Sequence, residues 1–291
     1  MIEVAQPKSY SKMDIKASRA IKNMLIYLVA IVIALAFLIP LLWMLSGSLK
    51  AQNKMLTYPI QWIPNPFVFK NYVDAWKAIP FARYLLNTIF FVTLGALGDV
   101  VSSSLVGYSF ARLRFPGRNI LFILCLSTVM VPQTATIIPQ FVLFRALHSI
   151  DTYIPLILPS WFAFPYWVFL MRQFYMTIPE EFDQAAKIDG CGYLNIYLRV
   201  LLPLTKPAIA TIAIFAIIGD WQKFLEPLIY LNSQIKYTIS VGLSLFQGLY
   251  GTVSVTLLLA AAAIAMAPPI VIFFMAQKYF MQGINLSGGK D

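Results

Sequence analysis

The sequence has few charged residues for its length. Only 12% of its 291 residues are Asp, Glu, Lys or Arg, about half the share in an ordinary soluble domain. Surface-to-volume scaling leaves too little interior for a soluble fold of this size to bury its hydrophobic residues, which make up 59% of the chain. Disorder is excluded as well, because 15% of the residues are aromatic. The composition therefore indicates an integral membrane protein.

Cysteine and histidine are too scarce for several kinds of site. The chain has 2 cysteines, with Cys125 in an apolar run and Cys191 in a polar loop, so no disulfide framework is indicated. His148 and two distant cysteines do not assemble a His/Cys zinc site. The sequence also lacks a Gly-x-x-x-x-Gly-Lys-Ser/Thr element, so we do not expect the chain to bind ATP. We expect no catalytic residues, no metal and no cofactor bound by this chain.

Long apolar runs are what the sequence has in abundance. A helix needs about 20 apolar residues to cross the hydrocarbon core of a bilayer, and six segments meet or nearly meet this length. The predicted spans are 25–45, 84–110, 120–144, 154–174, 207 to about 231, and 253–280. Prolines interrupt the third, the fourth and, as Pro268-Pro269, the sixth. The predicted fold class is an all-α polytopic membrane protein with six transmembrane helices.

The basic residues predict how these spans are oriented. The net charge of +10 would suggest nucleic-acid binding in a soluble protein, but here Lys and Arg fall in short segments between apolar runs, so no nucleic-acid partner is expected. With both termini in the cytoplasm, cytoplasmic Lys and Arg outnumber those outside, as the positive-inside rule requires. The first run is preceded by too long a polar lead for a cleaved signal peptide. We therefore predict a multi-pass protein of a bacterial or archaeal cytoplasmic membrane, in contact with membrane lipid.

The predicted organisation divides the chain into five parts. They are a cytoplasmic N-terminal segment (1–23), a first transmembrane helix (24–46), an extracytoplasmic loop (47–83), a five-helix core (84–280) that includes a cytoplasmic loop at 176–206, and a cytoplasmic tail (281–291). In the 176–206 loop, Glu180, Glu181 and Asp183 follow Pro179, and acidic residues are favoured at a helix N-terminus. Gly190 suits a left-handed turn that ends this helix. The segment is either an interfacial helix hairpin lying on the bilayer or a docking element for a cytoplasmic partner.

The same loop carries a recognisable pattern. Gln184-Ala185-Ala186 is followed after three residues by Gly190, and nine residues then precede Val200-Leu201-Leu202-Pro203. This spacing resembles the EAA signature of ABC importer permeases, which reads Glu-Ala-Ala, three residues, Gly, nine residues, Ile, one residue, Leu-Pro. Gln184 stands in place of Glu, and Val200 in place of Ile. The lost carboxylate leaves open whether Asp183 or Glu181 supplies the acid.

Further segments resemble the carbohydrate branch of that family, the maltose-type permease with a MetI-like core. They are 71–72, 84–88, 107–117, 221–228 and 277–290, so the resemblance covers nearly the whole chain from about residue 24. It implies a membrane-spanning permease subunit of an ATP-driven, binding-protein-dependent sugar importer, forming half of the translocation path. It also implies a second homologous permease subunit, two ABC ATP-binding subunits that use ATP and Mg, and an extracytoplasmic solute-binding protein.

The resemblance also implies where the ATPase would bind. The loop at 179–203 is expected to enter a groove on the ATP-binding subunit. The residues expected at this contact are Glu181, Asp183, Gln184, Ala185, Ala186, Gly190, Leu202 and Pro203. In the maltose-type relatives the C-terminal tail reaches between the ATPases, and residues 283–290 are expected to do so here.

Polar groups inside the spans are candidates for a substrate path. Asp99 lies within the second span, and Asp220, Lys223 and Glu226 lie within the fifth. Such groups usually face a bundle interior or a water-filled path, so they form either a self-neutralised cluster or a lining. The candidates for the path are Asp99, Gln133, Thr134, Trp221, Gln222, Lys223 and Glu226. A free Lys223 would favour an acidic solute, such as a uronate oligosaccharide or glycerol phosphate, whereas the preferred interpretation pairs it with Glu226.

Two other functional classes are less consistent with the sequence. An intramembrane enzyme would need a nucleophile, a histidine pair or a set of metal ligands, and scattered acids with one His supply none of these. An ion-coupled carrier would be indicated by inverted repeats, and no convincing internal duplication is apparent.

Overall fold

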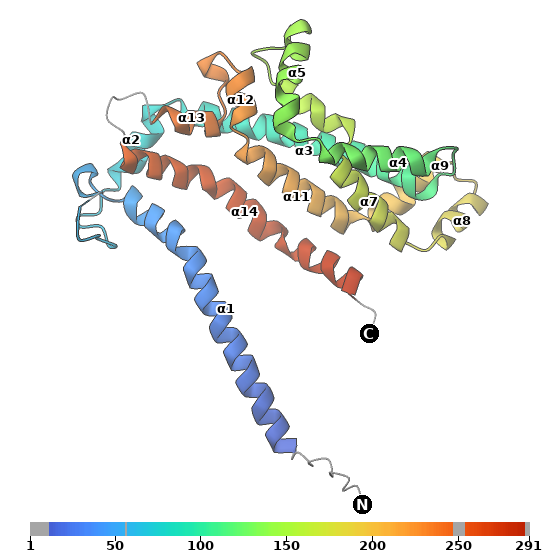
Figure 1. Ribbon diagram of the computed structural model, residues 1–291, viewed down its shortest axis with the longest axis horizontal. Coiled ribbons are helices and arrows are strands. Elements are labelled where there is room, and N and C mark those ends of the chain that lie inside the picture. Colours follow the sequence, from blue (N-terminus) through green and yellow to red (C-terminus); the bar gives the residue numbers. More distant parts are fainter. Residues whose placement is uncertain (1–11, 56, 247–253, 289–291) are drawn as a thin grey trace, which may run out of the picture.

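The computed structural model describes residues 12–55, 57–246 and 254–288, and every regular element among them is helical (Figure 1). The α-helices are α1 (Lys12–Ser48), α2 (Lys70–Ala78), α3 (Phe81–Arg112), α4 (Arg118–Ser127), α5 (Gln133–Ala146), α6 (Ile154–Ile157), α7 (Pro165–Thr177), α8 (Glu181–Ile188), α9 (Tyr193–Asn195), α10 (Leu202–Leu204), α11 (Lys206–Gln222), α12 (Leu225–Tyr230), α13 (Ile239–Leu245) and α14 (Val255–Gly288). Short 3-10 turns η1 (Gln52–Lys54), η2 (Thr128–Met130), η3 (Leu158–Phe162) and η5 (Gln234–Lys236), and the π-helical η4 (Ile196–Leu201), join them. The prediction of an all-α fold is confirmed.

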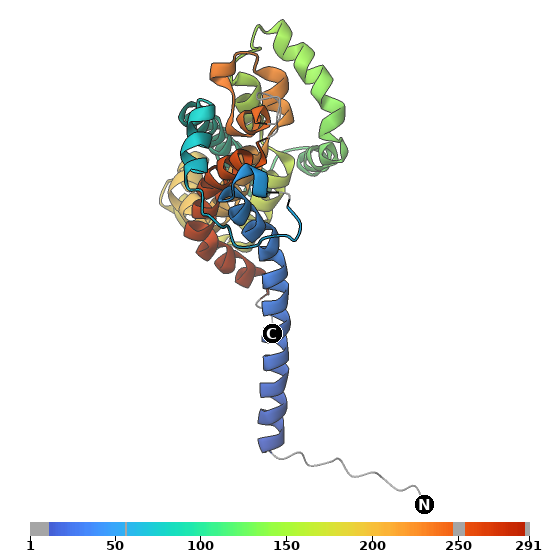
Figure 2. The same cartoon turned by 90° about the vertical axis from the view of Figure 1, so that its left-hand side faces the viewer.

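Helix α3 is the centre of the bundle. Helices α7 and α11 pack along it, and α14 packs against α11. Helices α2 and α13 lie at one end of the bundle and α8 and α9 at the other, whereas α12 projects from its side next to α5 (Figure 1). Helix α1 contacts α14 near the first of these ends and then diverges from the rest of the molecule (Figures 1 and 2).

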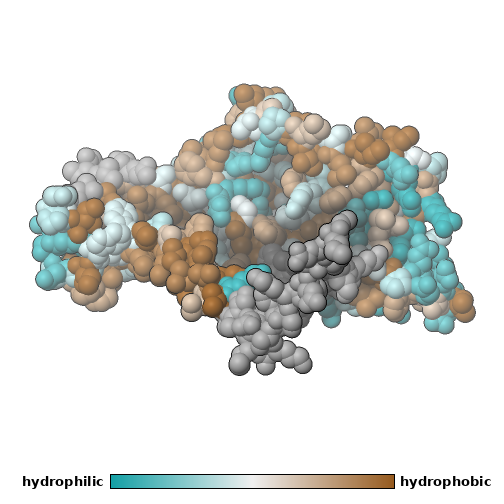
Figure 3. Space-filling model, turned by 60° about the horizontal axis from the view of Figure 1, so that its bottom comes forward, coloured by the Kyte–Doolittle hydropathy of each residue, from teal (hydrophilic) through white to brown (hydrophobic). Residues whose placement is uncertain are grey.

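Length and composition support up to six membrane spans in the described part of the chain. Four qualify alone, namely Ile21–Ser48, Phe81–Arg112, Ile154–Thr177 and Val255–Gln277. Two bent pairs qualify together, Arg118–Met130 with Gln133–Ala146, bent by 98°, and Tyr193–Leu204 with Lys206–Gln222, bent by 79°. Hydrophilic side chains gather at both ends of the long axis, with large hydrophobic areas between them (Figure 3). This distribution is typical of a polytopic membrane protein.

Two of the predicted spans differ from the observed helices at prolines. The fifth predicted span does not continue to residue 231, because α11 ends at Gln222 and Lys223 leaves the helical conformation, with φ −57° and ψ 124°. A proline ring tends to clash with the carbonyl four residues before it, and for Pro227 that carbonyl belongs to Lys223, the residue that follows α11. Conversely, α14 runs through Pro268-Pro269 without a break and extends as helix to Gly288, well into the predicted tail. Residues 289–291 of that tail lie outside the described residues.

Two clusters of buried side chains hold the helices together. One surrounds the first half of α3 and includes Phe91, Trp221 and Ala261. The other surrounds its second half and includes Tyr108 and Met171. At Gly107, between these helices, a Cβ atom would lie 2.6 Å from Cβ of Met171. The backbones of α3 and α7 approach so closely there that only glycine fits.

Candidate functional site

Helix α8 has the start and stop signals that its sequence predicts. Glu181 and Asp183 lie in its first turn. At its end Gly190 adopts φ +79°, and the N–H groups of Gly190 and Cys191 donate to the carbonyls of Lys187 and Ala186, at 3.0 and 2.9 Å. These are the two hydrogen bonds of a Schellman motif. The predicted left-handed turn at Gly190 is confirmed, and it redirects the chain into the second half of the loop.

Only one of the two alanines of the EAA-like pattern lies on the exposed face of α8. Asp183 and Ala186 are buried against the bundle. The exposed residues at i, i+3, i+4 and i+7 spacing are Glu181, Gln184, Ala185 and Ile188. Ile188 is 87% exposed, and it is the one residue of this face that no motif indicated. The outer face of α8 is therefore formed by Glu181, Gln184, Ala185 and Ile188.

Burial distinguishes Asp183 from Glu181, the two acids that could replace the carboxylate lost at Gln184. Asp183 Oδ2 lies 3.3 Å from Nε of Arg112, the last residue of α3, and the two side chains are only 11% and 8% exposed. Burial raises the pKa of Asp183, and the neighbouring Arg112 opposes that rise. Glu181 remains exposed. Asp183 is thus paired with Arg112 inside the chain, and Glu181 is the acid that is exposed.

The second half of the loop is anchored to α3 as well. Tyr197, in η4, shares a hydrogen bond of 2.7 Å with the hydroxyl of Ser104, and the hydroxyl of Tyr108 donates to the carbonyl of Tyr193 at 3.1 Å. Leu202 is half-buried, whereas Pro203 is exposed. Both halves of the loop are therefore held against α3.

The polar groups within the spans form two separate contacts. Nζ of Lys223 lies 2.6 Å from Oδ1 of Asp220, and Nε2 of Gln133 donates to Oε1 of Glu226 at 2.6 Å. The preferred pairing of Lys223 with Glu226 is wrong. Because α11 ends at Gln222, the N–H of Lys223 closes a turn on the carbonyl of Asp220 at 3.1 Å, while Glu226 belongs to a new helix, α12.

The remaining path candidates are distributed between core and surface. Asp99 is buried within α3. One turn before it, Gly95 leaves room for the carboxylate of Asp220, because a Cβ atom at Gly95 would lie only 2.6 Å from Oδ2 of Asp220. The indole N–H of the buried Trp221 donates to the carbonyl of Ala265 at 3.1 Å, so this ring packs in the core of the chain. The exposed candidates are Gln133, Thr134 and Gln222. Among the described residues, no group of three or more His, Cys, Asp or Glu is arranged to hold a metal ion.

Comparison with known proteins identifies the family. Residues 103–286 match the family described as binding-protein-dependent transport system inner membrane component. The chain is also 33% identical, over 89% of its length and 92% of the relative, to the arabinooligosaccharides transport system permease protein AraQ of Bacillus subtilis (strain 168). The chain belongs to the family of binding-protein-dependent transport system inner membrane components. As such it is a non-catalytic permease subunit.

Other relatives of this permease agree over nearly the full length. The melibiose/raffinose/stachyose import permease protein MelC of Bacillus subtilis (strain 168) is 31% identical over 93% of this chain and 98% of its own. A solved bacterial ABC transporter involved in the import of the acidic polysaccharide alginate has a similar fold, with a TM-score of 0.80 at 22% identity, covering 94% of this chain and all of that one. The predicted MetI-like fold is confirmed.

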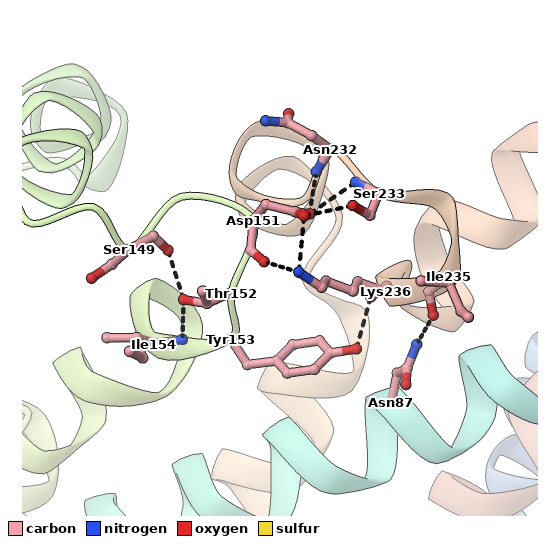
Figure 4. Close-up of polar contacts among 10 residues, drawn as sticks. All are labelled: Asn87, Ser149, Asp151, Thr152, Tyr153, Ile154, Asn232, Ser233, Ile235 and Lys236. Atoms are coloured by element: carbon pink, nitrogen blue, oxygen red, sulfur yellow. Dashed lines mark hydrogen bonds and ion pairs between the residues drawn. The ribbon is translucent and has the colours of Figure 1, made fainter.

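One polar cluster of the permease was not indicated by any motif. Between α5 and α6, Asp151 accepts hydrogen bonds from the backbone N–H groups of Asn232 (3.0 Å) and Ser233 (2.8 Å) and pairs with Nζ of Lys236 at 2.9 Å (Figure 4). Burial opposes ionisation, but these hydrogen bonds outweigh it and lower the pKa of Asp151. Asp151 has a φ of +60°, a conformation that Asp tolerates better than most residues do. The residue type at position 151 is therefore compatible with this turn, but it does not indicate the partners of the carboxylate.

Proposed function

We propose that this permease forms half of the translocation path of an ATP-driven sugar importer and couples to a partner ATPase through its 179–203 loop. The observation that carries this proposal is the outer face of α8. It is an exposed face on a short helix that is held to α3 from beneath. Ala185 allows a partner backbone to approach closely, Glu181 offers a charge, and Ile188 supplies an apolar anchor of the kind that fills pockets at interfaces.

Sugar is the proposed class of solute because of the relatives and of the polar groups in the spans. AraQ and MelC are named for oligosaccharides. Broken helices at membrane depth normally line a cavity, and Gln133 and Glu226 lie beside the break between α4 and α5. Amide and carboxylate groups of this kind can exchange hydrogen bonds with sugar hydroxyls.

A neutral sugar is favoured over the acidic alternatives. Lys223, the cation that would attract a uronate oligosaccharide or glycerol phosphate, is neutralised by Asp220 at 2.6 Å. The other ionisable path candidates, Asp99 and Glu226, are acids, which repel an anionic solute. In this proposal Glu226 orients sugar hydroxyls, and the Asp220–Lys223 pair joins α11 to the segment that precedes α12.

The proposal places the permease in the cytoplasmic membrane and requires partners within it and on both of its sides. They are a second homologous permease subunit, two ABC ATP-binding subunits and an extracytoplasmic solute-binding protein. A solved alginate transporter of related fold, with a TM-score of 0.62 at 20% identity, is in complex with an alginate pentasaccharide-bound periplasmic protein. In the proposed orientation α8 faces the cytoplasm, and the Asp151 cluster lies on the side where the solute-binding protein would dock.

The proposal is tested by purifying the tagged permease from its own membranes in mild detergent and identifying the co-purifying subunits by mass spectrometry. We expect a second permease and an ATP-binding subunit. Ala185→Trp should release the ATP-binding subunit, because this residue is exposed on the outer face of α8. The matched control is Ala82→Trp, an exposed alanine at the start of α3, at the opposite end of the bundle.

Uptake by the purified complex then tests the solute. Reconstituted with its binding protein, the complex should move neutral oligosaccharides and not uronate oligosaccharides. Purification of the chain alone or as a homo-oligomer, under conditions that preserve known complexes, would contradict the assignment of the loop. Preferential uptake of uronates would leave the importer intact and overturn only the choice of a neutral solute.

A further inference from the structure

Three residues of α3, spaced four apart, each hold the 176–206 loop. They are Ser104, Tyr108 and Arg112, and residues at this spacing lie along one face of a helix. Ser104 binds Tyr197, Tyr108 binds the carbonyl of Tyr193, and Arg112 pairs with Asp183. The stripe therefore contacts η4, the start of α9 and α8 in turn.

These contacts are buried or partly buried. Ser104, Tyr108, Asp183 and Tyr197 are buried. Arg112 also donates from Nη2 to the carbonyl of Ile178, the residue that ends α7. One guanidinium thus holds both the beginning of the loop and α8. Buried polar contacts of this kind have defined geometry, so the loop has little freedom to slide along α3.

Helix α3 is a continuous rod that leads from these contacts to the opposite end of the bundle. Its 32 residues contain no proline, which corresponds to about 48 Å of helix. At its other end, Asn87 donates to the carbonyls of Ile235 and Tyr237, both at 2.9 Å, and Thr88 accepts from the N–H of Ile239 at 2.8 Å. Figure 4 shows Asn87 beneath the Asp151 cluster. A displacement of the loop therefore reaches both ends of the bundle through one helix.

We propose that Ser104, Tyr108 and Arg112 are positioning residues that lock the 176–206 loop onto α3, so that closure of the ATPases moves α3 with the loop. The proposal rests on the proposed function, because it needs an ATPase bound to the outer face of α8. Without the lock, α8 still binds the ATPase but rocks against α3. ATP is then hydrolysed without a matching movement of the spans.

The test uses the complete importer in proteoliposomes, with both permeases, the ATPases and the binding protein. The quantity measured is sugar transported per ATP hydrolysed. Arg112→Gln and Asp183→Asn each remove the buried ion pair between the two side chains. Each is expected to lower the ratio about tenfold, which corresponds to about 1.4 kcal/mol, while the ATPase still co-purifies. The matched control is Arg114→Gln, an exposed arginine two residues further along, which should behave as wild type.

Two further variants separate positioning from general stability. Tyr108→Phe and Ser104→Ala remove one hydroxyl each, and both variants are expected to fold. Each should lower the amount of sugar transported per ATP severalfold. These variants keep the proposal testable if Arg112→Gln does not fold. The exchange Arg112→Asp with Asp183→Arg should recover part of the ratio. If Tyr108→Phe and Asp183→Asn transported as much sugar per ATP as the wild type, the proposal of a lock would be overturned. The proposed function would still stand, because the wild-type complex would transport sugar. If the wild-type assembly hydrolysed ATP but moved no sugar, the proposed function itself would fail.

Discussion

Replacing Asp151 with alanine is expected to lower the stability of the permease considerably. The carboxylate accepts from two backbone N–H groups and pairs with Lys236, and it also accepts from the Ser233 hydroxyl. Each hydrogen bond to a charged group contributes about 1.5–3 kcal/mol when it is protected from water. The side chain is 26% exposed, so water replaces part of the loss, and we expect a total of about 3 kcal/mol.

The assay is thermal unfolding of the purified permease in detergent. A chain of this size loses about 2–4 °C of Tm per kcal/mol, so Asp151→Ala should unfold about 6–12 °C below wild type. The matched control is Asp74→Ala, because Asp74 pairs with Lys70 at 4.0 Å on the surface. Surface pairs of this kind contribute about 0.3–0.5 kcal/mol. Equal Tm values for the two variants would refute the reasoning.

The pH dependence of the same cluster has a definite sign. Hydrogen bonding lowers the pKa of folded Asp151, whereas the unfolded value is about 4. The carboxylate therefore stabilises the fold fully above about pH 4, and this contribution is lost as the pH falls further toward the folded pKa. The Tm gap between wild type and Asp151→Asn should be constant from about pH 8 to about pH 5 and narrow below about pH 4.

Three further predictions concern the bundle and the loop. Gly107→Ala places a Cβ 2.6 Å from Met171, and thermal unfolding should show a loss of about 1–3 kcal/mol; an unchanged Tm would mean that α3 and α7 separate easily. Lys223→Gln leaves the buried Asp220 unpaired and should lower the free energy of unfolding by about 3 kcal/mol. Adding Asp220→Asn should recover most of this stability in the same thermal assay. If it did not, the ion pair would not be the source of the loss. Gly190→Val forces a branched side chain to φ +79°, which costs about 1–2 kcal/mol and should reduce sugar uptake, whereas Gly192→Val, at an extended φ of −72°, is the control that should not.

The sequence by itself determined the class of protein, the approximate spans and the loop. Hydropathy reports whether a segment can lie in a bilayer, and this property is local, so every predicted span except the fifth was located to within a few residues. The turn at Gly190 was predictable for the same reason, because a Schellman motif depends on residues next to one another.

Only the tertiary structure decided which polar groups meet. Asp183 and Arg112 lie far apart in the chain, and nothing local to either indicates that the carboxylate is buried against α3. Likewise the partner of Lys223 depended on where α11 ends, and Trp221 faces the core because α14 supplies a carbonyl to its indole N–H. A pairing between distant segments is set by how helices pack, and the spacing of residues along one segment does not contain that information.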